Sequence, residues 1–277
     1  MALFCMDIHS ECLTRMTSLQ VILPDISDQR RWDNGLLPVL WLLHGATDDQ
    51  SMWHRFTSLE RYAQSRGIAV VMPAVETSFY TNTDGGRYFD YVTEELPRKL
   101  CKYFPLSPLR EDNFLAGMSM GGHGTMKLGF SKPEKYAMLG IFSCANFIDM
   151  IGDMIPGGKR HPLNFIRWQV FGVQDEVGDL SVCHGTENDN RYLARLASES
   201  GKPLPKILPA ADVRMVAMTT RWKTWHCSVL SRIPSTLHSM TVMVCIISNF
   251  GINGWPCLYS SCQFVSAPTR CFPDERM

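Results

Sequence analysis

Short hydrophobic runs alternate with segments of helical character over the first half of the chain. The hydrophobic runs cover residues 18–23, 36–43, 68–72, 113–116 and 137–143, and the helical segments cover residues 58–65, 91–104 and 125–130. A continuous apolar run such as LLPVLWLL at residues 36–43 is typical of a strand buried on both faces of a sheet. Strands that alternate with helices predict an α/β fold, in which a mostly parallel sheet is flanked by crossover helices.

Length and charge narrow the class of protein. The chain has 277 residues, a length that fits one large α/β domain or two small ones, and it carries 27 acidic and 27 basic side chains. A net charge of zero argues against a surface that binds nucleic acid or an anionic membrane. No apolar run reaches the roughly 18–20 residues of a membrane-spanning helix. The N-terminus MALFCMDIHSEC lacks the basic and apolar regions of a signal peptide. We therefore expect a cytoplasmic protein whose ten cysteines are mostly reduced thiols.

The stretch GMSMGG at residues 117–122 matches the pattern G-x-S-x-G. It follows a predicted strand and precedes a predicted helix, which is the context of a nucleophile elbow. In an elbow, glycines let two backbone segments pass close to a strained serine whose hydroxyl points into a cleft. Ser119 is then the candidate nucleophile, and the backbone N–H of Met120 faces the developing oxyanion. The alternative is a plain glycine-rich turn.

A second motif, His44-Gly45-Ala46, comes directly after the predicted strand at residues 36–43. In α/β-hydrolases a turn of this kind supplies the other oxyanion N–H, here that of Ala46. His44 itself is expected to fix the turn. It precedes the candidate nucleophile, whereas the catalytic order on this fold is Ser, then Asp or Glu, then His.

Longer stretches resemble the esterase D and S-formylglutathione hydrolase-like group of α/β-hydrolases, in particular its tributyrin-esterase branch. They include LPVLWLLHGATDDQSMW, GGRYFDYVTEELP and FPLSPLREDNFLAGMSMGGHGTMKL, and the resemblance covers residues 1 to about 207. It implies an α/β-hydrolase fold and hydrolysis of a small-molecule ester or thioester by a Ser–His–Asp triad, without metal or cofactor. It assigns the nucleophile to Ser119 and the oxyanion hole to the N–H groups of Ala46 and Met120. It leaves a homo-oligomer open.

Other polar residues of the family-like part have less reactive interpretations. Packing or loop shaping is expected for five residues near the site, which are Asp48, Trp53, Tyr80, Arg87 and Tyr88. His123 is expected to pack on its helix or lie at the surface, and Cys144 to be a buried inert thiol. Two histidines, His161 and His184, have no family match, and a solvated loop is expected for Asp175, Glu176 and Asp179.

The C-terminal part breaks this pattern. Of the 27 acidic residues, 25 lie at or before Asp212, and residues 213–273 contain none. The family carries its catalytic Asp and His in this region, and neither segment is found. Read in a shifted frame, the same codons permit a Cys-Cys-Gly turn with an Asp, followed by Gly-x-His-Asn-Phe-Glu-Phe-Trp-Asp. We therefore expect an incomplete hydrolase domain at residues 1–207 and a frame-shifted, poorly ordered tail at residues 208–277.

Three functional classes stay open at this point. The first is a serine carboxylesterase or thioesterase, and the second is a catalytically inactive remnant or binding protein that lacks the triad His and Asp. The third is an acyl transferase, because fold alone does not fix function. The tail could rebuild a triad only from Asp212 with His226 or His238. If the tail is frame-shifted, these three residues are there by accident.

Overall fold

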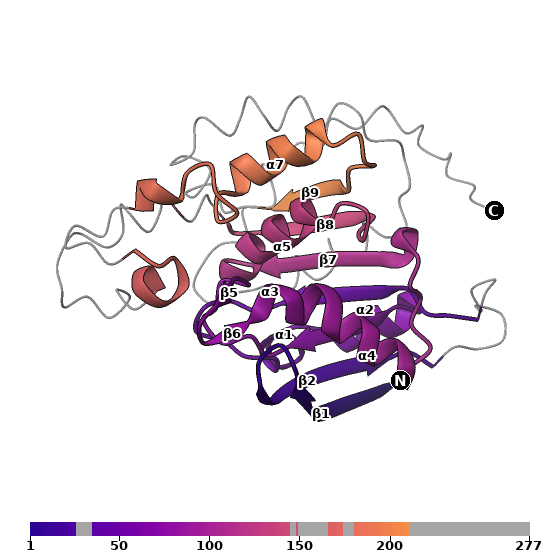
Figure 1. The fold of residues 1–277 in the computed structure, drawn as a ribbon. Coiled ribbons are helices and arrows are strands. Elements are labelled where there is room, and N and C mark those ends of the chain that lie inside the picture. Colours follow the sequence, from indigo (N-terminus) through magenta and orange to yellow (C-terminus); the bar gives the residue numbers. More distant parts are fainter. Residues whose placement is uncertain (26–34, 145–147, 149–165, 174–179, 211–277) are drawn as a thin grey trace, which may run out of the picture.

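The computed structural model describes residues 1–25, 35–144, 148, 166–173 and 180–210. Within these residues a seven-stranded sheet has the order β1-β2-β4-β3-β7-β8-β9 (Figure 1). Its strands are β1 (Ala2–Ser10), β2 (Arg15–Leu23), β3 (Val39–Leu43), β4 (Ala69–Pro73), β7 (Asn113–Met118), β8 (Met138–Phe142) and β9 (Lys206–Ala210). β1, β2 and β4 pair antiparallel, and all pairs from β4 to β9 are parallel. This confirms the predicted α/β class.

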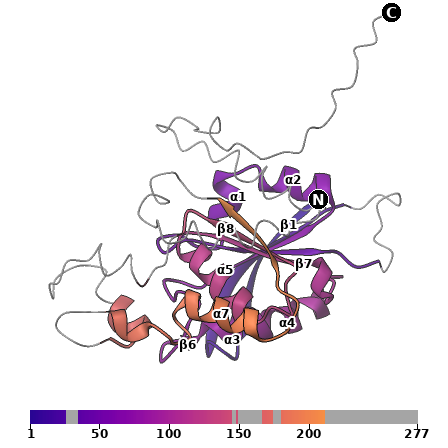
Figure 2. The same cartoon turned by 90° about the horizontal axis from the view of Figure 1, so that it is seen from above.

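The helices cover both faces of this sheet. They are α1 (Met52–Phe56), α2 (Leu59–Arg66), α3 (Tyr88–Asp90), η2 (Tyr91–Glu95), α4 (Leu96–Tyr103), η3 (Arg110–Asp112), α5 (Met120–Ser131), η4 (Ile166–Val170), η5 (Leu180–Cys183) and α7 (Asn190–Glu199). A two-stranded ribbon of β5 (Asn82–Thr83) and β6 (Gly86–Arg87) precedes α3. Seen from above, α1 and α2 lie on one face, and α3, α4, α5 and α7 lie on the other (Figure 2).

The alternation of side chains along β3 explains why the strand is apolar throughout. Leu40 and Leu42 belong to the core cluster that also contains Trp53 and Leu59 from the α1–α2 side. Val39, Trp41 and Leu43 belong to the cluster on the opposite face. Because successive side chains of a strand point to opposite faces, a strand covered on both sides has no polar position. The observed strand is shorter than the predicted one, because β3 begins at Val39, three residues into the apolar run at 36–43.

Strand β1 is missing from the sequence prediction. Its first four residues are exposed, so the strand carries no buried apolar run from which it could be recognised. Its conformation comes from pairing with β2 along the full length, from Ala2 opposite Leu23 to Ser10 opposite Arg15. The predicted strand at 18–23 is correspondingly longer, since β2 begins at Arg15.

The predicted helix at 91–104 changes helical type just before Pro97, between Glu95 and Leu96. A short α-helix, α3, leads into the π-helix η2, and α4 follows with Pro97 in its first turn. Proline has no N–H, so the carbonyl four residues earlier, that of Thr93, loses its α-helical donor. The Lys135 ammonium donates to this carbonyl oxygen at 2.6 Å. The helix therefore continues through the proline, and another segment satisfies the carbonyl.

The last described strand crosses the predicted domain boundary. β9 pairs in parallel with β8 from Lys206 opposite Met138 to Ala210 opposite Phe142. The sheet thus continues three residues beyond Ile207. Several residues considered in the sequence lie outside the described ranges: His161, Asp175, Glu176, Asp179, Asp212, His226 and His238.

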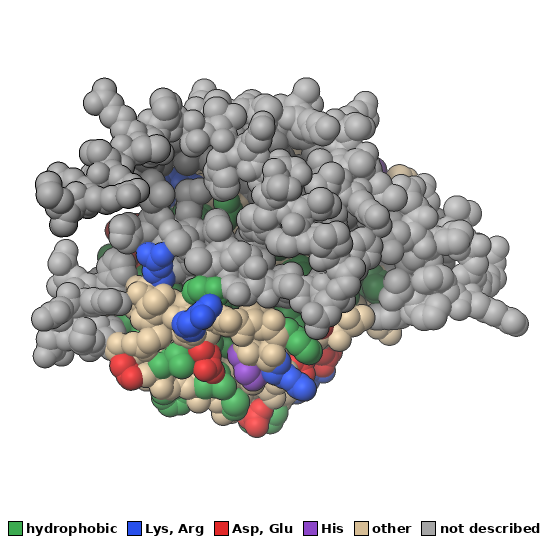
Figure 3. Space-filling model, turned by 180° about the vertical axis from the view of Figure 1, so that it is seen from behind, with side chains coloured by type: hydrophobic (Ala, Val, Ile, Leu, Met, Phe, Trp, Pro, Cys, Tyr) green, Lys and Arg blue, Asp and Glu red, His purple; other side chains and the backbone are tan. Residues whose placement is uncertain are grey.

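Surface charge and cysteine state can be compared with expectation in the described part only. Acidic, basic and hydrophobic side chains are interspersed on the described portion of the face in Figure 3. None of the helices in the described ranges is long and apolar enough to cross a membrane. The cysteines within those ranges, Cys5, Cys12, Cys101, Cys144 and Cys183, are all thiols.

Candidate active site at the carboxyl edge of the sheet

Ser119 forms the turn between β7 and α5. Its φ of 55° and ψ of −116° lie where non-glycine residues are rarely found. Its N–H donates to the carbonyl oxygen of Phe142 at 3.0 Å, which ties the turn to strand β8. The strand–turn–helix order is as predicted, but the turn is shorter than residues 117–122. The strand continues to Met118 and the helix begins at Met120, so Ser119 alone reverses the chain.

Glycines around Ser119 allow this short turn. A Cβ on Gly117 would meet the backbone of Gly121 and lie 2.8 Å from the Cβ of Leu43. A Cβ on Gly121 would lie 2.9 Å from the carbonyl oxygen of His44, and one on Gly122 would lie 2.6 Å from the Cβ of Cys144. Strand β7, the start of α5 and the end of β3 therefore approach each other to a distance that only glycine permits.

The turn after β3 lies beside Ser119. Leu43 pairs with Gly117 across the parallel ladder, so both strands end at the same level of the sheet. A Cβ on Gly45 would lie 3.9 Å from the carbonyl oxygen of Met118. The backbone segments that carry Ala46 and Met120 are thus neighbours at the carboxyl edge of the sheet. Met120 is the first residue of α5, where the helix itself offers no acceptor for the N–H.

Hydrogen bonds on the ring of His44 fix the turn. His44 Nδ1 lies 2.7 Å from the carbonyl oxygen of Gly45, and the Val75 N–H donates to His44 Nε2 at 3.1 Å. A carbonyl can only accept, so these partners require the neutral ring with its proton on Nδ1. Burial lowers the pKa of His44, which keeps the ring neutral. His44 is therefore a buried turn-forming residue, as expected.

The orientation of the Ala46 N–H follows from the same contacts. The Gly45 carbonyl oxygen also accepts from the Asp48 N–H at 3.3 Å. In a planar trans peptide the C=O and the following N–H point in opposite directions. Holding the Gly45 carbonyl with His44 and Asp48 thus sets the direction of the N–H of Ala46.

The five residues expected to pack or shape loops have these surroundings. Trp53 is buried and donates through Nε1 to the Leu43 carbonyl oxygen at 3.0 Å, and Tyr80 donates to the His44 carbonyl oxygen at 3.0 Å. The backbone of Asp48 braces the turn as described above. The Tyr88 hydroxyl donates to Glu76 at 2.9 Å, and the exposed Arg87 forms a 3.5 Å ion pair with Asp90.

His123 packs on the elbow helix, in agreement with one of the two expected roles. It is fully buried, its Nδ1 lies 3.0 Å from Nδ2 of Asn190, and its ring contacts Phe79 and Phe171. Burial and the nearby Lys127 charge lower the pKa of His123 to about 3. A ring that resists protonation in this way is poorly suited to accept a proton from Ser119.

The remaining side chains considered in the sequence have inert or peripheral surroundings. Burial raises the pKa of the Cys144 thiol, which keeps it protonated and weakly nucleophilic. His184 is exposed, and its Nδ1 lies 3.5 Å from Oδ2 of Asp189. Groups of three or more His, Cys, Asp or Glu side chains that could hold a metal ion are absent from the described residues.

One residue near the site was not identified from the sequence. The Thr77 hydroxyl donates to the Ala46 carbonyl oxygen at 2.7 Å. Its sequence position, 31 residues after Ala46, gives no signal of this contact. The geometry as a whole brings a strained serine together with the two backbone segments that carry Ala46 and Met120, at the carboxyl edge of the sheet.

Comparison with known proteins agrees with this geometry. Residues 10–239 match the protein-family model described as "Putative esterase", so the match continues past Ile207. The acetyl esterase of Caldicellulosiruptor saccharolyticus is 30% identical over 220 residues, which cover 76% of this chain and 79% of that protein. The S-formylglutathione hydrolase of Paracoccus denitrificans is 30% identical over 162 residues, which cover 46% of this chain and 57% of that protein.

Two solved structures from Staphylococcus aureus are similar over most of their length. The substrate-bound fluorophosphonate-binding serine hydrolase FphF is 30% identical with a TM-score of 0.67, covering 90% of this chain and 98% of that one. The S-formylglutathione hydrolase FrmB is 28% identical with a TM-score of 0.69, covering 90% and 97%. From the matched family model, the identity to the acetyl esterase and the shared architecture, we conclude that the chain belongs to this esterase family and has the α/β-hydrolase fold.

Proposed function

We propose that the chain is built as a serine carboxylesterase or thioesterase for short acyl groups. The observation that carries this proposal is the position of Ser119 on a strained strand-to-helix turn, beside the turn that holds Ala46. The relatives named acetyl esterase and S-formylglutathione hydrolase support an acyl ester or thioester as substrate. A homo-oligomer and a cytoplasmic location remain part of the proposal.

The proposed reaction has two halves. Ser119 Oγ attacks the acyl carbon while a base takes the hydroxyl proton, and the N–H groups of Ala46 and Met120 stabilise the oxyanion. The bond to the leaving oxygen or sulfur breaks, and the alcohol or thiol departs with that proton. Water then attacks the acyl-enzyme with the help of the same base, which releases the acid and restores Ser119.

The base is not supplied by the two buried histidines near the turn. His44 uses both ring nitrogens on backbone groups, and His123 has a pKa of about 3. His9 and His54 precede Ser119 in the chain, and the exposed His184 lies beside Asp189, so the proposal takes its His and Asp from outside the described residues. We propose that the chain from about Leu208 is read out of frame and that the in-frame product carries them. The family match to residue 239 counts against a break at Leu208, which makes this point testable.

The catalytic proposal is tested by turnover of a p-nitrophenyl short-chain ester and of an S-acyl thioester, with Ser119→Ala as the control. Turnover that Ser119→Ala abolishes supports the enzyme. The alternative is an inactive remnant or binding protein, favoured by the surroundings of His44 and His123. It predicts turnover no higher than that of Ser119→Ala, because loss of triad members lowers kcat by roughly 10⁴–10⁶-fold.

The reading frame is tested separately. Sequencing of the gene and its transcript across the codons for Ile207 and Leu208 decides whether the chain is translated as written. If both reading frames can be expressed, the in-frame protein is expected to exceed the chain as written in esterase turnover. Equal turnover would show that the frame does not matter, and His226 or His238 would become the candidate bases.

A further inference from the structure

The segment that follows β4 contacts the turn after β3 at three points. The Val75 N–H donates to His44 Nε2 at 3.1 Å, the Thr77 hydroxyl donates to the Ala46 carbonyl oxygen at 2.7 Å, and the Tyr80 hydroxyl donates to the His44 carbonyl oxygen at 3.0 Å. The three donors come from one stretch of six residues, 75–80, and all three acceptors lie within residues 44–46.

The same segment has an unusual backbone. Positive φ is found at Glu76 (50°), Phe79 (51°) and Tyr80 (57°), where side chains are rarely tolerated. A strained conformation persists only when surrounding contacts determine it. The full burial of Phe79 and Tyr80, together with the hydrogen bonds to residues 44–46, provides those contacts. The segment is therefore held in one conformation against the turn.

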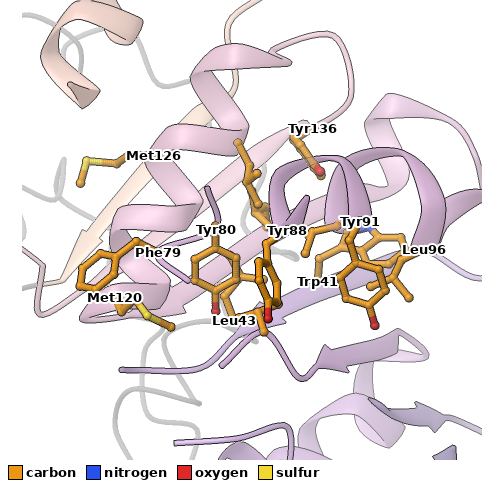
Figure 4. Packing of buried hydrophobic residues seen from close by; sticks show 14 of the residues in the cluster. Trp41, Leu43, Phe79, Tyr80, Tyr88, Tyr91, Leu96, Met120, Met126 and Tyr136 are labelled. Carbon is orange, nitrogen blue, oxygen red and sulfur yellow. The ribbon is translucent and has the colours of Figure 1, made fainter. Parts of the chain in front are cut away.

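Tyr80 also contacts the elbow helix. Its ring lies so close to α5 that a Cβ on Gly124 would be 2.5 Å from the ring Cγ. The His44 carbonyl oxygen that accepts the Tyr80 hydroxyl faces Gly121, since a Cβ there would be 2.9 Å away. Figure 4 shows the ring between Phe79 and Tyr88, with its hydroxyl directed toward the end of β3 at Leu43. One side chain thus touches both backbone segments that carry the oxyanion donors.

We propose that Tyr80 and Thr77 are positioning residues that hold the Ala46 N–H in register with the Met120 N–H. The inference rests on the proposed function, since it assigns these residues to the oxyanion site of Ser119. Tyr80 fixes the His44–Gly45 peptide on one side of Ala46, and Thr77 fixes the Ala46–Thr47 peptide on the other. The peptide between them, which carries the Ala46 N–H, then has little freedom to rotate.

The test is made in whichever product, in-frame or as written, shows turnover that Ser119→Ala abolishes. It compares Tyr80→Phe with Tyr91→Phe, which removes a phenol oxygen from another buried tyrosine of the same core. Removing an oxyanion donor outright lowers kcat by roughly 10²–10³-fold, so a displaced donor should cost about tenfold. Tyr80→Phe is expected to lower kcat for a short-chain ester by this factor with KM within about twofold. It should also accelerate hydrogen exchange of the Ala46 amide, measured by NMR. Tyr91→Phe should change neither quantity.

A second pair of variants guards against misfolding of Tyr80→Phe. Thr77 is only half-buried, so Thr77→Val removes the hydroxyl with little change in shape. Thr77→Val is expected to lower kcat at unchanged KM, and Thr77→Ser, which restores a hydroxyl, to recover most of the loss. Equal kcat in Thr77→Val and Thr77→Ser would overturn the role of Thr77. Equal kcat and equal Ala46 exchange in Tyr80→Phe and Tyr91→Phe would overturn that of Tyr80.

Failure of the proposed function gives a different result. If neither the chain as written nor the in-frame product shows turnover that Ser119→Ala abolishes, the esterase proposal fails. The exchange rate of the Ala46 amide then decides the positioning role alone. Faster exchange in Tyr80→Phe than in Tyr91→Phe supports it, and equal exchange refutes it.

Discussion

The Lys127 ammonium, buried on the elbow helix, donates to Oδ1 of Asn188 at 2.6 Å. Its second acceptor is the Thr81 hydroxyl at 2.9 Å, so both acceptors are neutral. Asn188 lies just before α7, and Thr81 follows the segment 75–80. One ammonium therefore joins α5 to two segments that pack against it.

Lys127 should make the folded state more stable as the pH rises. Burial lowers its pKa from 10.5 to about 8, and the neighbouring Glu187 charge opposes this shift. Between pH 8 and 10.5 the unfolded chain holds more protons than the folded one, so stability rises with pH in this window. We expect urea denaturation to show an increase of up to about 3 kcal/mol from this group. Lys127→Met should lack that rise, and identical pH slopes up to pH 9.5 would contradict the prediction.

Gly121→Ala should destabilise the protein although it replaces glycine inside a helix. Alanine favours a helix over glycine by about 1 kcal/mol. A Cβ at Gly121 would however meet the backbone carbonyls of Leu43 and His44, which cannot move aside without displacing β3. We expect a net loss of about 2 kcal/mol or more in unfolding free energy, measured by thermal or urea denaturation.

The control for Gly121→Ala is Gly85→Ala. A Cβ on Gly85 would meet only the Thr83 hydroxyl, at an ordinary distance of 3.6 Å. Gly85→Ala is expected to change stability by less than about 0.5 kcal/mol. A Gly121→Ala protein as stable as the parent would mean that β3 and α5 are less closely packed than the structure has them.

The fold was predictable where burial alone determines structure. The parallel strands β3, β4, β7 and β8 are apolar because both faces of each are covered, so their runs are visible in the sequence. Strand β1 was not, because exposed residues such as Phe4 and Cys5 adopt strand geometry only through pairing with β2. The helix at 91–104 was predicted through Pro97, but the contact that satisfies its free carbonyl was hidden, since Lys135 donates to Thr93 from 42 residues away.

The candidate site, like the fold, was predictable from the sequence only in part. Ser119 and the HGA turn carry local patterns, because the glycines and the strand-to-helix order are adjacent in sequence. Tyr80 was assigned only a loop-shaping role and Thr77 none, because their partners in residues 44–46 lie 36 and 31 residues away. Contacts of that kind follow from the order of β3 and β4 in the sheet, which local pattern does not encode.

Lys135 and Pro97 should be energetically coupled. In the parent protein Lys135 supplies the donor that the Thr93 carbonyl lacks because of Pro97. Pro97→Ala provides a backbone N–H in its place, so Lys135→Met should destabilise the Pro97→Ala background less than the parent. A double-mutant cycle from urea denaturation is expected to give a coupling of about 1 kcal/mol. The ion pair of Lys135 with Glu94 persists in both backgrounds and cancels from the cycle. A coupling indistinguishable from zero would show that Lys135 does not replace the N–H that Pro97 lacks.

Glu95 should make the fold sensitive to acid. Burial alone would raise its pKa, but the Lys99 ammonium at 2.6 Å, the Cys12 N–H and the Ser10 hydroxyl lower it from 4.5 to about 2. A depressed carboxyl pKa contributes stability that is present above the unfolded value of 4.5 and lost as the pH falls toward 2. Glu95→Gln is therefore expected to lose about 2–3 kcal/mol at pH 7 and to show a flatter stability profile between pH 5 and 3. The exposed Glu111→Gln serves as the control and should retain the parent profile. If Glu95→Gln and Glu111→Gln gave the same acid midpoint, the contacts of Glu95, at the end of η2, with the β1–β2 turn would not be what makes the fold sensitive to acid.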